Sequence, residues 1–131
     1  MKYYIATKLD NAAQHNLIRD ILDHLGHQIT YDWTAHGPVY DRGPRVCVEV
    51  AEKELRGVTT ADFVIVLKPG GRGTHVEFGA ALGCHIPIIC LTTDREDYTP
   101  APATCIFYYH ESVRKVKSVK ELLEAVKSLT P

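Results

Sequence analysis

The sequence lacks the long apolar run that a membrane-spanning helix needs. Its longest apolar stretches, near residues 62–67 and 86–91, fall far short of the roughly 20 residues that cross a bilayer. The N-terminus, MKYYIATKLD, has no signal-peptide core or cleavage site, which predicts a cytoplasmic protein. No charge of one sign dominates, because 15 Lys and Arg stand against 16 Asp and Glu. We therefore expect neither a membrane nor a nucleic acid polymer as partner.

Cysteine and histidine lack the spacing of a metal site. The chain contains no C-x-x-C pair and no H-E-x-x-H motif. We interpret the four cysteines as small apolar core residues in a reducing compartment. They are Cys47, Cys84, Cys90 and Cys105. Neither a metal nor an organic cofactor is expected.

Strand-like and helix-like patterns alternate along the chain, whose 131 residues suit one compact domain over 1–131. Strands are expected over 2–6, 28–33, 62–67, 86–91 and 104–109. Helices are expected around 13–25 and over 45–57, 74–83 and 119–129. This order predicts a Rossmann- or flavodoxin-like three-layer α/β sandwich with a five-stranded parallel sheet. In such folds, ligands bind beyond the carboxyl ends of the strands.

Helical spacing also predicts which apolar side chains are buried. The first helix carries a stripe of Ala13, Leu17, Ile18, Ile21, Leu22 and Leu25, followed by Gly26 as a left-handed cap. The second helix should bury Cys47, Val50, Ala51, Leu55 and Val58. Two loops separate these elements from the rest: 34–44, a candidate lid because of its length, and 92–103.

The segment 61–83, ADFVIVLKPGGRGTHVEFGAALG, carries the clearest chemistry. The glycines of its turn let the backbone approach a ligand, and free N–H groups at the helix start attract anionic oxygens. Glu77 is expected in the first turn of this helix, where the helix dipole would keep it ionised. A carboxylate there can attack an anomeric carbon and form a covalent glycosyl intermediate.

A structural interpretation of the same residues stands beside the catalytic one. Thr74-x-x-Glu77 is also the spacing of a capping box, in which the glutamate only binds the cap backbone. The spacing alone leaves both interpretations open. A plain cap needs no triple-glycine turn before it, which favours the nucleophile.

Glu54 is the second carboxylate of interest because it falls on the apolar stripe of the second helix. A charge on that face lies at the rim of the core or points into a pocket. Desolvation beside Glu77 would raise its pKa, as suits a proton donor to a leaving base. The alternative is an exposed glutamate at the edge of the stripe.

These residues resemble the nucleoside 2-deoxyribosyltransferase-like proteins over most of the chain. The similar segments are YYIATKLDNAAQHNLIRDILDHLGHQITYDW, ELRGVTTADFVIVL and GRGTHVEFGAALGCHIPIICL. The resemblance implies that Glu77 is the nucleophile and that Glu54 is the acidic residue before the third strand, where members more often have Asp. It also places Gly71 where the transferases have an aspartate. That departure favours hydrolysis, as in the family's deoxynucleoside monophosphate N-glycosidase branch.

The resemblance further implies how substrate is held. The loop from Thr7 would line the sugar or phosphate site beside Gly71 and Gly73. Lys8 and Arg72 are the nearest cations for a 5′-phosphate, unless they are ordinary solvated side chains. Trp33, with His36 and Tyr40 nearby, would stack on a base or else belong to the core. The family pattern implies a homo-oligomer in which a neighbouring subunit completes the pocket through its 92–103 loop.

A second resemblance agrees on the bond and on the residue. PGGRGTHVE is similar to the PGG-x-GT-x-x-E motif of the cytokinin-activating phosphoribohydrolases, whose motif glutamate also falls on Glu77. We therefore expect cleavage or transfer of the N-glycosidic bond of a nucleoside or nucleoside 5′-monophosphate. The rival from another class is a non-catalytic nucleotide-binding module that uses Glu77 as a cap.

Overall fold

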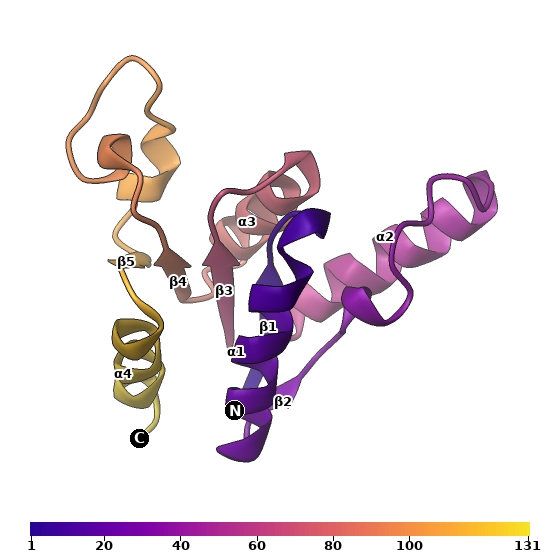
Figure 1. The fold of residues 1–131 in the computed structure, drawn as a ribbon, viewed down its shortest axis with the longest axis horizontal. Helices are drawn as coiled ribbons and strands as arrows, with labels where there is room; N and C mark the ends of the chain where they lie inside the picture. Colours follow the sequence, from indigo (N-terminus) through magenta and orange to yellow (C-terminus); the bar gives the residue numbers. More distant parts are fainter.

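Five parallel strands form one sheet through the centre of the computed structural model, which describes residues 1–131 (Figure 1). The strands are β1 (Lys2–Ala6), β2 (Gln28–Ile29), β3 (Phe63–Leu67), β4 (Ile88–Leu91) and β5 (Val113–Val116). Their order is β2-β1-β3-β4-β5, and every neighbouring pair is parallel. The expected α/β fold with a five-stranded parallel sheet is confirmed.

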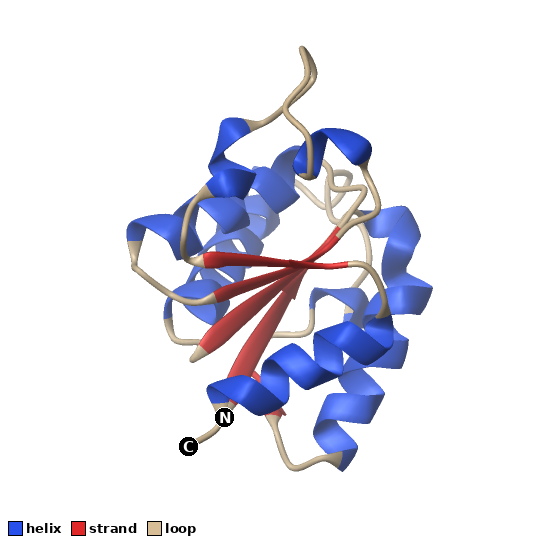
Figure 2. Cartoon of the chain, turned by 90° about the vertical axis from the view of Figure 1, so that its left-hand side faces the viewer, coloured by secondary structure: helices blue, strands red, loops and turns tan.

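Four helices cover the two faces of the sheet and make three layers (Figure 2). They are α1 (Ala12–His24), α2 (Pro44–Thr59), α3 (Arg72–Gly83) and α4 (Val119–Leu129). Because successive strand residues point to opposite faces, β1 supplies Tyr3 and Ile5 to the core under α1 and α4. It supplies Tyr4 and Ala6 to the core under α2 and α3.

The two central strands fix where a site can form. All five residues of β3 and Tyr3 to Ala6 of β1 are buried, as the continuous apolar runs predict. Tyr3 pairs with Phe63 and Ala6 with Val66, so both strands end at the same edge of the sheet. The loops that follow Ala6 and Leu67 therefore lie side by side.

The strand predicted over 104–109 is wrong. Residues Ile106–Tyr109 form a short 3-10 helix, and the fifth strand follows at Val113–Val116. The aromatic run resembles a strand, but its side chains do not alternate between two buried faces. Tyr108 alone is buried, whereas Ile106 and Phe107 are exposed. The true strand was missed because it is a short edge strand that carries two cations in its sequence, VRKV.

The second strand is shorter than the predicted 28–33. It ends at Ile29, and Asp32 starts a 3-10 helix, Trp33–Ala35, by accepting a hydrogen bond from the backbone of Thr34. Side-chain capping by aspartate competes with strand pairing at such positions. Trp33 thus leaves the sheet, and the fourth strand likewise starts at Ile88, two residues later than predicted.

The helices match the predicted positions, but several expected core residues are exposed. Gly26 takes the left-handed conformation expected after α1, with φ +92°. The exposed ones are Ala13 and Leu17 of α1, Leu25 just after it, and Ala51 and Leu55 of α2. Figure 1 shows that the N-terminal part of α2 reaches beyond the sheet, and the buried residues of this helix, Gly57 and Val58, lie near its C-terminal end.

The cysteines also depart in part from the prediction. Cys90 is buried, Cys47 and Cys105 are half-buried, and Cys84 is exposed just after α3; all four are free thiols. No helix is both long and apolar enough to cross a membrane.

Candidate active site

A pocket of about 240 Å³ opens at the carboxyl edge of β1 and β3. Four segments from separate parts of the sequence meet there: the turn after β1, the 3-10 helix Trp33–Ala35, helix α2 and the start of α3. The lining residues are Thr7, Lys8, Leu9, Trp33, Glu54, Gly71, Gly73, Thr74 and Glu77. Seven of the eight residues predicted for the site thus lie together; Arg72, at the first position of α3, is exposed and outside the lining.

Glu77 is buried, with only 7% of its surface exposed. Its carboxylate accepts a hydrogen bond from the hydroxyl of Tyr4 on β1. Burial raises the pKa of Glu77 to about 8, the Tyr4 hydrogen bond opposes this rise, and the Glu54 charge adds to it. The expectation that the helix start keeps Glu77 ionised is wrong. Helix α3 begins at Arg72, so Glu77 lies in its second turn, beyond the strongest effect of the helix dipole.

The proposed Thr74-x-x-Glu77 capping box is also wrong. Gly71 is the residue that caps α3, and its backbone N–H donates to the Thr74 hydroxyl at 3.0 Å. Glu77 binds Tyr4 rather than a cap backbone. The Glu77 carboxylate therefore does not cap the N-terminus of α3.

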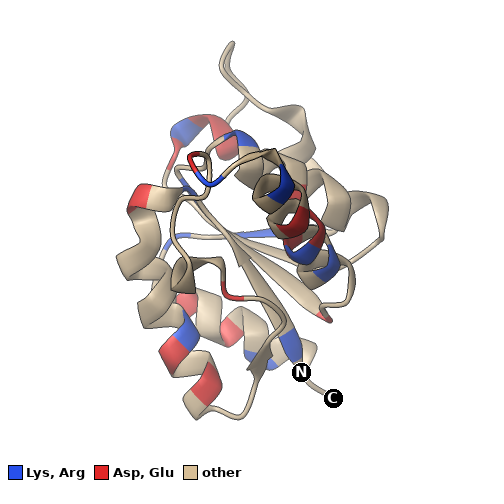
Figure 3. Ribbon diagram, turned by 90° about the vertical axis from the view of Figure 1, so that its right-hand side faces the viewer, with Lys and Arg blue, Asp and Glu red and all other residues tan.

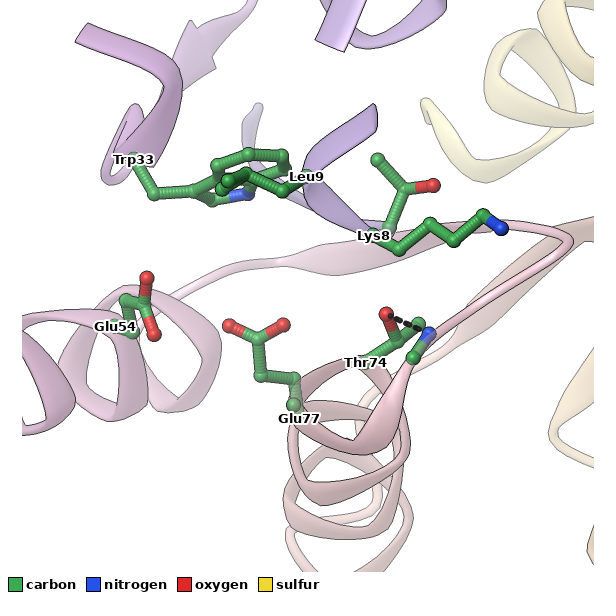
Figure 4. Close-up of a pocket in the computed structure, with 9 residues that line it drawn as sticks. Lys8, Leu9, Trp33, Glu54, Thr74 and Glu77 are labelled. Atoms are coloured by element: carbon green, nitrogen blue, oxygen red, sulfur yellow. Dashed lines mark hydrogen bonds between the residues drawn. The ribbon is translucent and has the colours of Figure 1, made fainter. Parts of the chain in front are cut away.

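Glu54 faces the same pocket from α2. Figure 4 shows its carboxylate and that of Glu77 pointing toward one another from two helices. Glu54 is half-buried, and burial raises its pKa, an effect that nearby His36 partly offsets. Of the two positions left open for Glu54, the structure has the one that points into the pocket.

Trp33 belongs to both the core and the pocket. It is 4% exposed, its indole N–H donates to the carbonyl of Ile5 at 3.0 Å, and its ring forms one wall of the pocket (Figure 4). The prediction that His36 and Tyr40 join Trp33 at the base site is wrong. Tyr40 is 83% exposed, and neither it nor His36 lines the pocket.

The opposite end of the pocket is built for an anion. The backbone N–H groups of Arg72, Gly73 and Thr74 have no hydrogen-bond partner in the protein. Such free amides at a helix start bind anionic oxygens. Lys8 extends along the same end, and its ammonium lies 3.5 Å from Asp10 at the surface. Thr7 instead serves the scaffold by donating to the carbonyl of Leu67 at 2.9 Å.

Tyr4 is the contact that the sequence reasoning missed. A tyrosine within an otherwise apolar central strand must bury its hydroxyl, and a buried hydroxyl needs a partner. That signal could have linked it to a polar residue at the sheet edge. Elsewhere, no three His, Cys, Asp or Glu side chains gather as metal ligands would.

Comparison with known proteins supports the same fold and adds a family. None of the curated proteins is similar enough to the chain to match it. The solved structure of a CMP N-glycosidase, BcmB, from Clostridium botulinum is similar, with a TM-score of 0.63 and 18% sequence identity. That similarity covers 99% of this chain and 100% of the other. The profile of the family described as nucleoside 2-deoxyribosyltransferase matches residues 3–126. The chain therefore belongs to the nucleoside 2-deoxyribosyltransferase family.

Proposed function

We propose that the protein cleaves the N-glycosidic bond of a nucleoside or nucleoside 5′-monophosphate, with Glu77 as nucleophile. The observation that carries the proposal is a buried carboxylate, oriented by Tyr4, that faces a second carboxylate across a small pocket. Family membership supports this bond class. The similar fold of a protein described as a CMP N-glycosidase supports a monophosphate substrate.

The two carboxyl groups divide the reaction between them. An oxygen of ionised Glu77 attacks C1′ of the sugar as the bond from C1′ to the base nitrogen breaks. The electron pair of that bond leaves with the base, which takes a proton from Glu54. Water then attacks C1′, gives its proton to Glu54 and releases the Glu77 carboxylate.

The pocket keeps a proton on its pair of carboxyl groups near neutral pH. Burial raises the pKa of both glutamates, and the negative charge of Glu54 adds to the rise at Glu77, which reaches about 8, so the pair retains a proton near neutral pH. The reaction requires this proton on Glu54 at the moment of attack, and not on Glu77, whose pKa is the one raised to about 8. The hydrogen bond from Tyr4 favours the ionised form of Glu77, which is what attack requires.

The ends of the pocket indicate how the substrate lies. The free amides of Arg72, Gly73 and Thr74 would bind a 5′-phosphate, with Lys8 beside them. The wall formed by Trp33 lies on the other side of the carboxylates and would contact the base (Figure 4). The Arg72 side chain has no part in this arrangement, because it lies outside the lining.

We expect free base to be released from one or more members of a panel of nucleosides and their 5′-monophosphates, measured by chromatography. With excess acceptor base present, free sugar or sugar phosphate should exceed newly formed nucleoside. The reason is Gly71, which has no side chain to hold an incoming base where the transferases have an aspartate. No base release from any member of the panel would contradict the proposed function.

Gly71→Asp tests whether the missing aspartate determines the ratio of hydrolysis to base exchange. Gly71 has φ −105°, which any residue can adopt, and an added Cβ would lie in ordinary contact with Lys8 at 3.5 Å. The variant should therefore fold and should shift products toward exchange, whereas Gly71→Ala should not. Dominant base exchange in the unaltered protein would show that Gly71 does not favour hydrolysis.

We also propose that the protein forms a homo-oligomer through the outer faces of α2 and α3. Val48 and Leu55 on α2 and Val76 on α3 are 59%, 40% and 61% exposed, and α2 reaches past the sheet. Charges of both signs alternate along α2 and surround this face (Figure 3), so two copies need not repel one another. We propose that the partner's 92–103 loop then covers the open side of the pocket.

Light scattering coupled to size exclusion should give a multiple of the 14.6 kDa monomer mass. Val76→Glu should dissociate the assembly because it would bury an unpaired charge. Leu17→Glu is the matched control, since Leu17 is 54% exposed on α1, over the other face of the sheet. A monomeric unaltered protein, or equal effects of both variants, would rule out this interface.

A further inference from the structure

A polar chain outside the pocket holds the glycine turn that precedes α3. The Nδ1 atom of His75 lies 2.9 Å from the carbonyl oxygen of Gly71. Because a carbonyl can only accept, Nδ1 carries the proton. The Nε2 atom lies 3.2 Å from the hydroxyl of Tyr108 and accepts its hydrogen. His75 therefore connects Gly71 to the 3-10 helix that ends at Tyr109.

Tyr108 is itself held rigidly. It is fully buried, and its ring stacks on Phe78 of α3 with centroids 4.5 Å apart. The ammonium of Lys68 lies 4.5 Å from the Tyr108 ring centroid and 2.7 Å from the carboxylate of Asp97. Asp97 is fully buried and also accepts from the Thr92 hydroxyl. The loop after β4 is thus tied, through Tyr108 and His75, to the turn after β3.

This series of polar contacts ends at Gly71, a residue that lines the pocket. Gly71 caps α3 and lines the pocket, and its own N–H is held by Thr74. Three glycines in the sequence PGGRG make the turn flexible by composition. Holding the Gly71 carbonyl fixes the peptide plane that it shares with the free N–H group of Arg72. The same carbonyl accepts the backbone N–H of His75 at 3.2 Å, so the His75 side chain adds a second, shorter hydrogen bond. Without the side-chain contact, this peptide plane would sample more directions.

We propose that His75 and Tyr108 are positioning residues that set the preference of the pocket for phosphorylated over unphosphorylated substrates. The inference rests on the proposed function, because it assigns the amides of the turn to a 5′-phosphate. Neither residue touches the substrate. Both act through Gly71, so their loss should affect binding of the phosphate and spare attack by Glu77.

The test compares kcat/KM for one nucleoside 5′-monophosphate and its nucleoside. Tyr108→Phe and His75→Phe should lower the ratio of the two by about three- to tenfold, the range of one intramolecular hydrogen bond. The loss should appear in KM for the monophosphate and leave the nucleoside unchanged. His75 is exposed, so His75→Phe should fold even if Tyr108→Phe does not.

Tyr109→Phe is the matched control. It removes a hydroxyl from the same 3-10 helix, one that donates to the backbone carbonyl of Glu96 at 2.8 Å instead of to His75. Its thermal stability should change less than that of Tyr108→Phe, because Tyr109 is 39% exposed, and the substrate ratio should not change. Equal ratios in all three variants and the unaltered protein would overturn the proposal.

A readout without turnover separates this proposal from the proposed function. The backbone amide NMR signals of Gly71 and Gly73 should move in His75→Phe and Tyr108→Phe and stay in place in Tyr109→Phe. If the signals move but the unaltered protein releases no base, His75 and Tyr108 do position the glycine turn, and the assignment of the turn to a substrate phosphate is wrong. If the signals do not move, His75 and Tyr108 do not position the glycine turn, whatever the activity of the protein.

Discussion

Glu77→Gln should lower the rate of base release by about 10⁴-fold or more, the scale seen when a covalent nucleophile is removed. An amide oxygen can still accept the hydrogen bond from Tyr4, so the variant keeps the shape and the buried contact of the side chain. It loses only the charge that attacks C1′. Single-turnover and steady-state rates with the best substrate of the panel measure the effect. Near-normal activity in Glu77→Gln would show that another group attacks.

The pKa of Glu77 gives this variant a second signature. Only the ionised form attacks, so kcat/KM of the unaltered protein should rise with pH toward about 8. Stability should change in the opposite direction. In the unfolded chain Glu77 ionises near 4.5 and in the fold only near 8, so the protein loses stability between these values. Glu77→Gln has no such loss and should melt above the unaltered protein at pH 9, but not at pH 4.

Most of the fold follows from two local signals. The buried run FVIVL and the alternation of strands with amphipathic helices predict a parallel sheet, and its carboxyl edge then locates the pocket. The predictions fail where local contacts compete with strand pairing, because sequence periodicity does not include such contacts. Asp32 ends the second strand by capping a 3-10 helix, and the run IFYY is bound through Tyr108 to α3 rather than to a strand.

The site was predictable where one segment determines it and unpredictable where three segments meet. PGGRGTHVE predicts a glycine turn with a carboxylate, and the stripe position of Glu54 predicts a charge near the core. The hydrogen bond between Tyr4 and Glu77 joins residues 73 positions apart, so no spacing rule indicates it. The exposure of Leu55 is a similar case, because it depends on which side of α2 the sheet and α3 cover.

Glu54→Gln should slow base release by about 10²–10⁴-fold, the usual contribution of a general acid. The size should depend on the leaving group, because only a poor leaving group needs a proton as the bond breaks. A monophosphate that carries an unactivated base should lose most of this factor. One with an electron-poor base or a nitrophenyl leaving group should lose little. Proton donation requires a protonated Glu54, and burial shifts the pKa of its carboxyl in that direction.

A neighbouring glutamate makes the control for Glu54 specific. Glu52 lies two residues earlier on α2 and is exposed, so Glu52→Gln removes the same charge from the same helix without touching the pocket. It should leave the rates of both kinds of substrate unchanged. Equal losses on activated and unactivated substrates in Glu54→Gln would mean that Glu54 positions the sugar or Glu77 instead of donating a proton. A loss confined to the unactivated substrate, with Glu77→Gln inactive on both, assigns the two carboxylates to separate steps of one reaction.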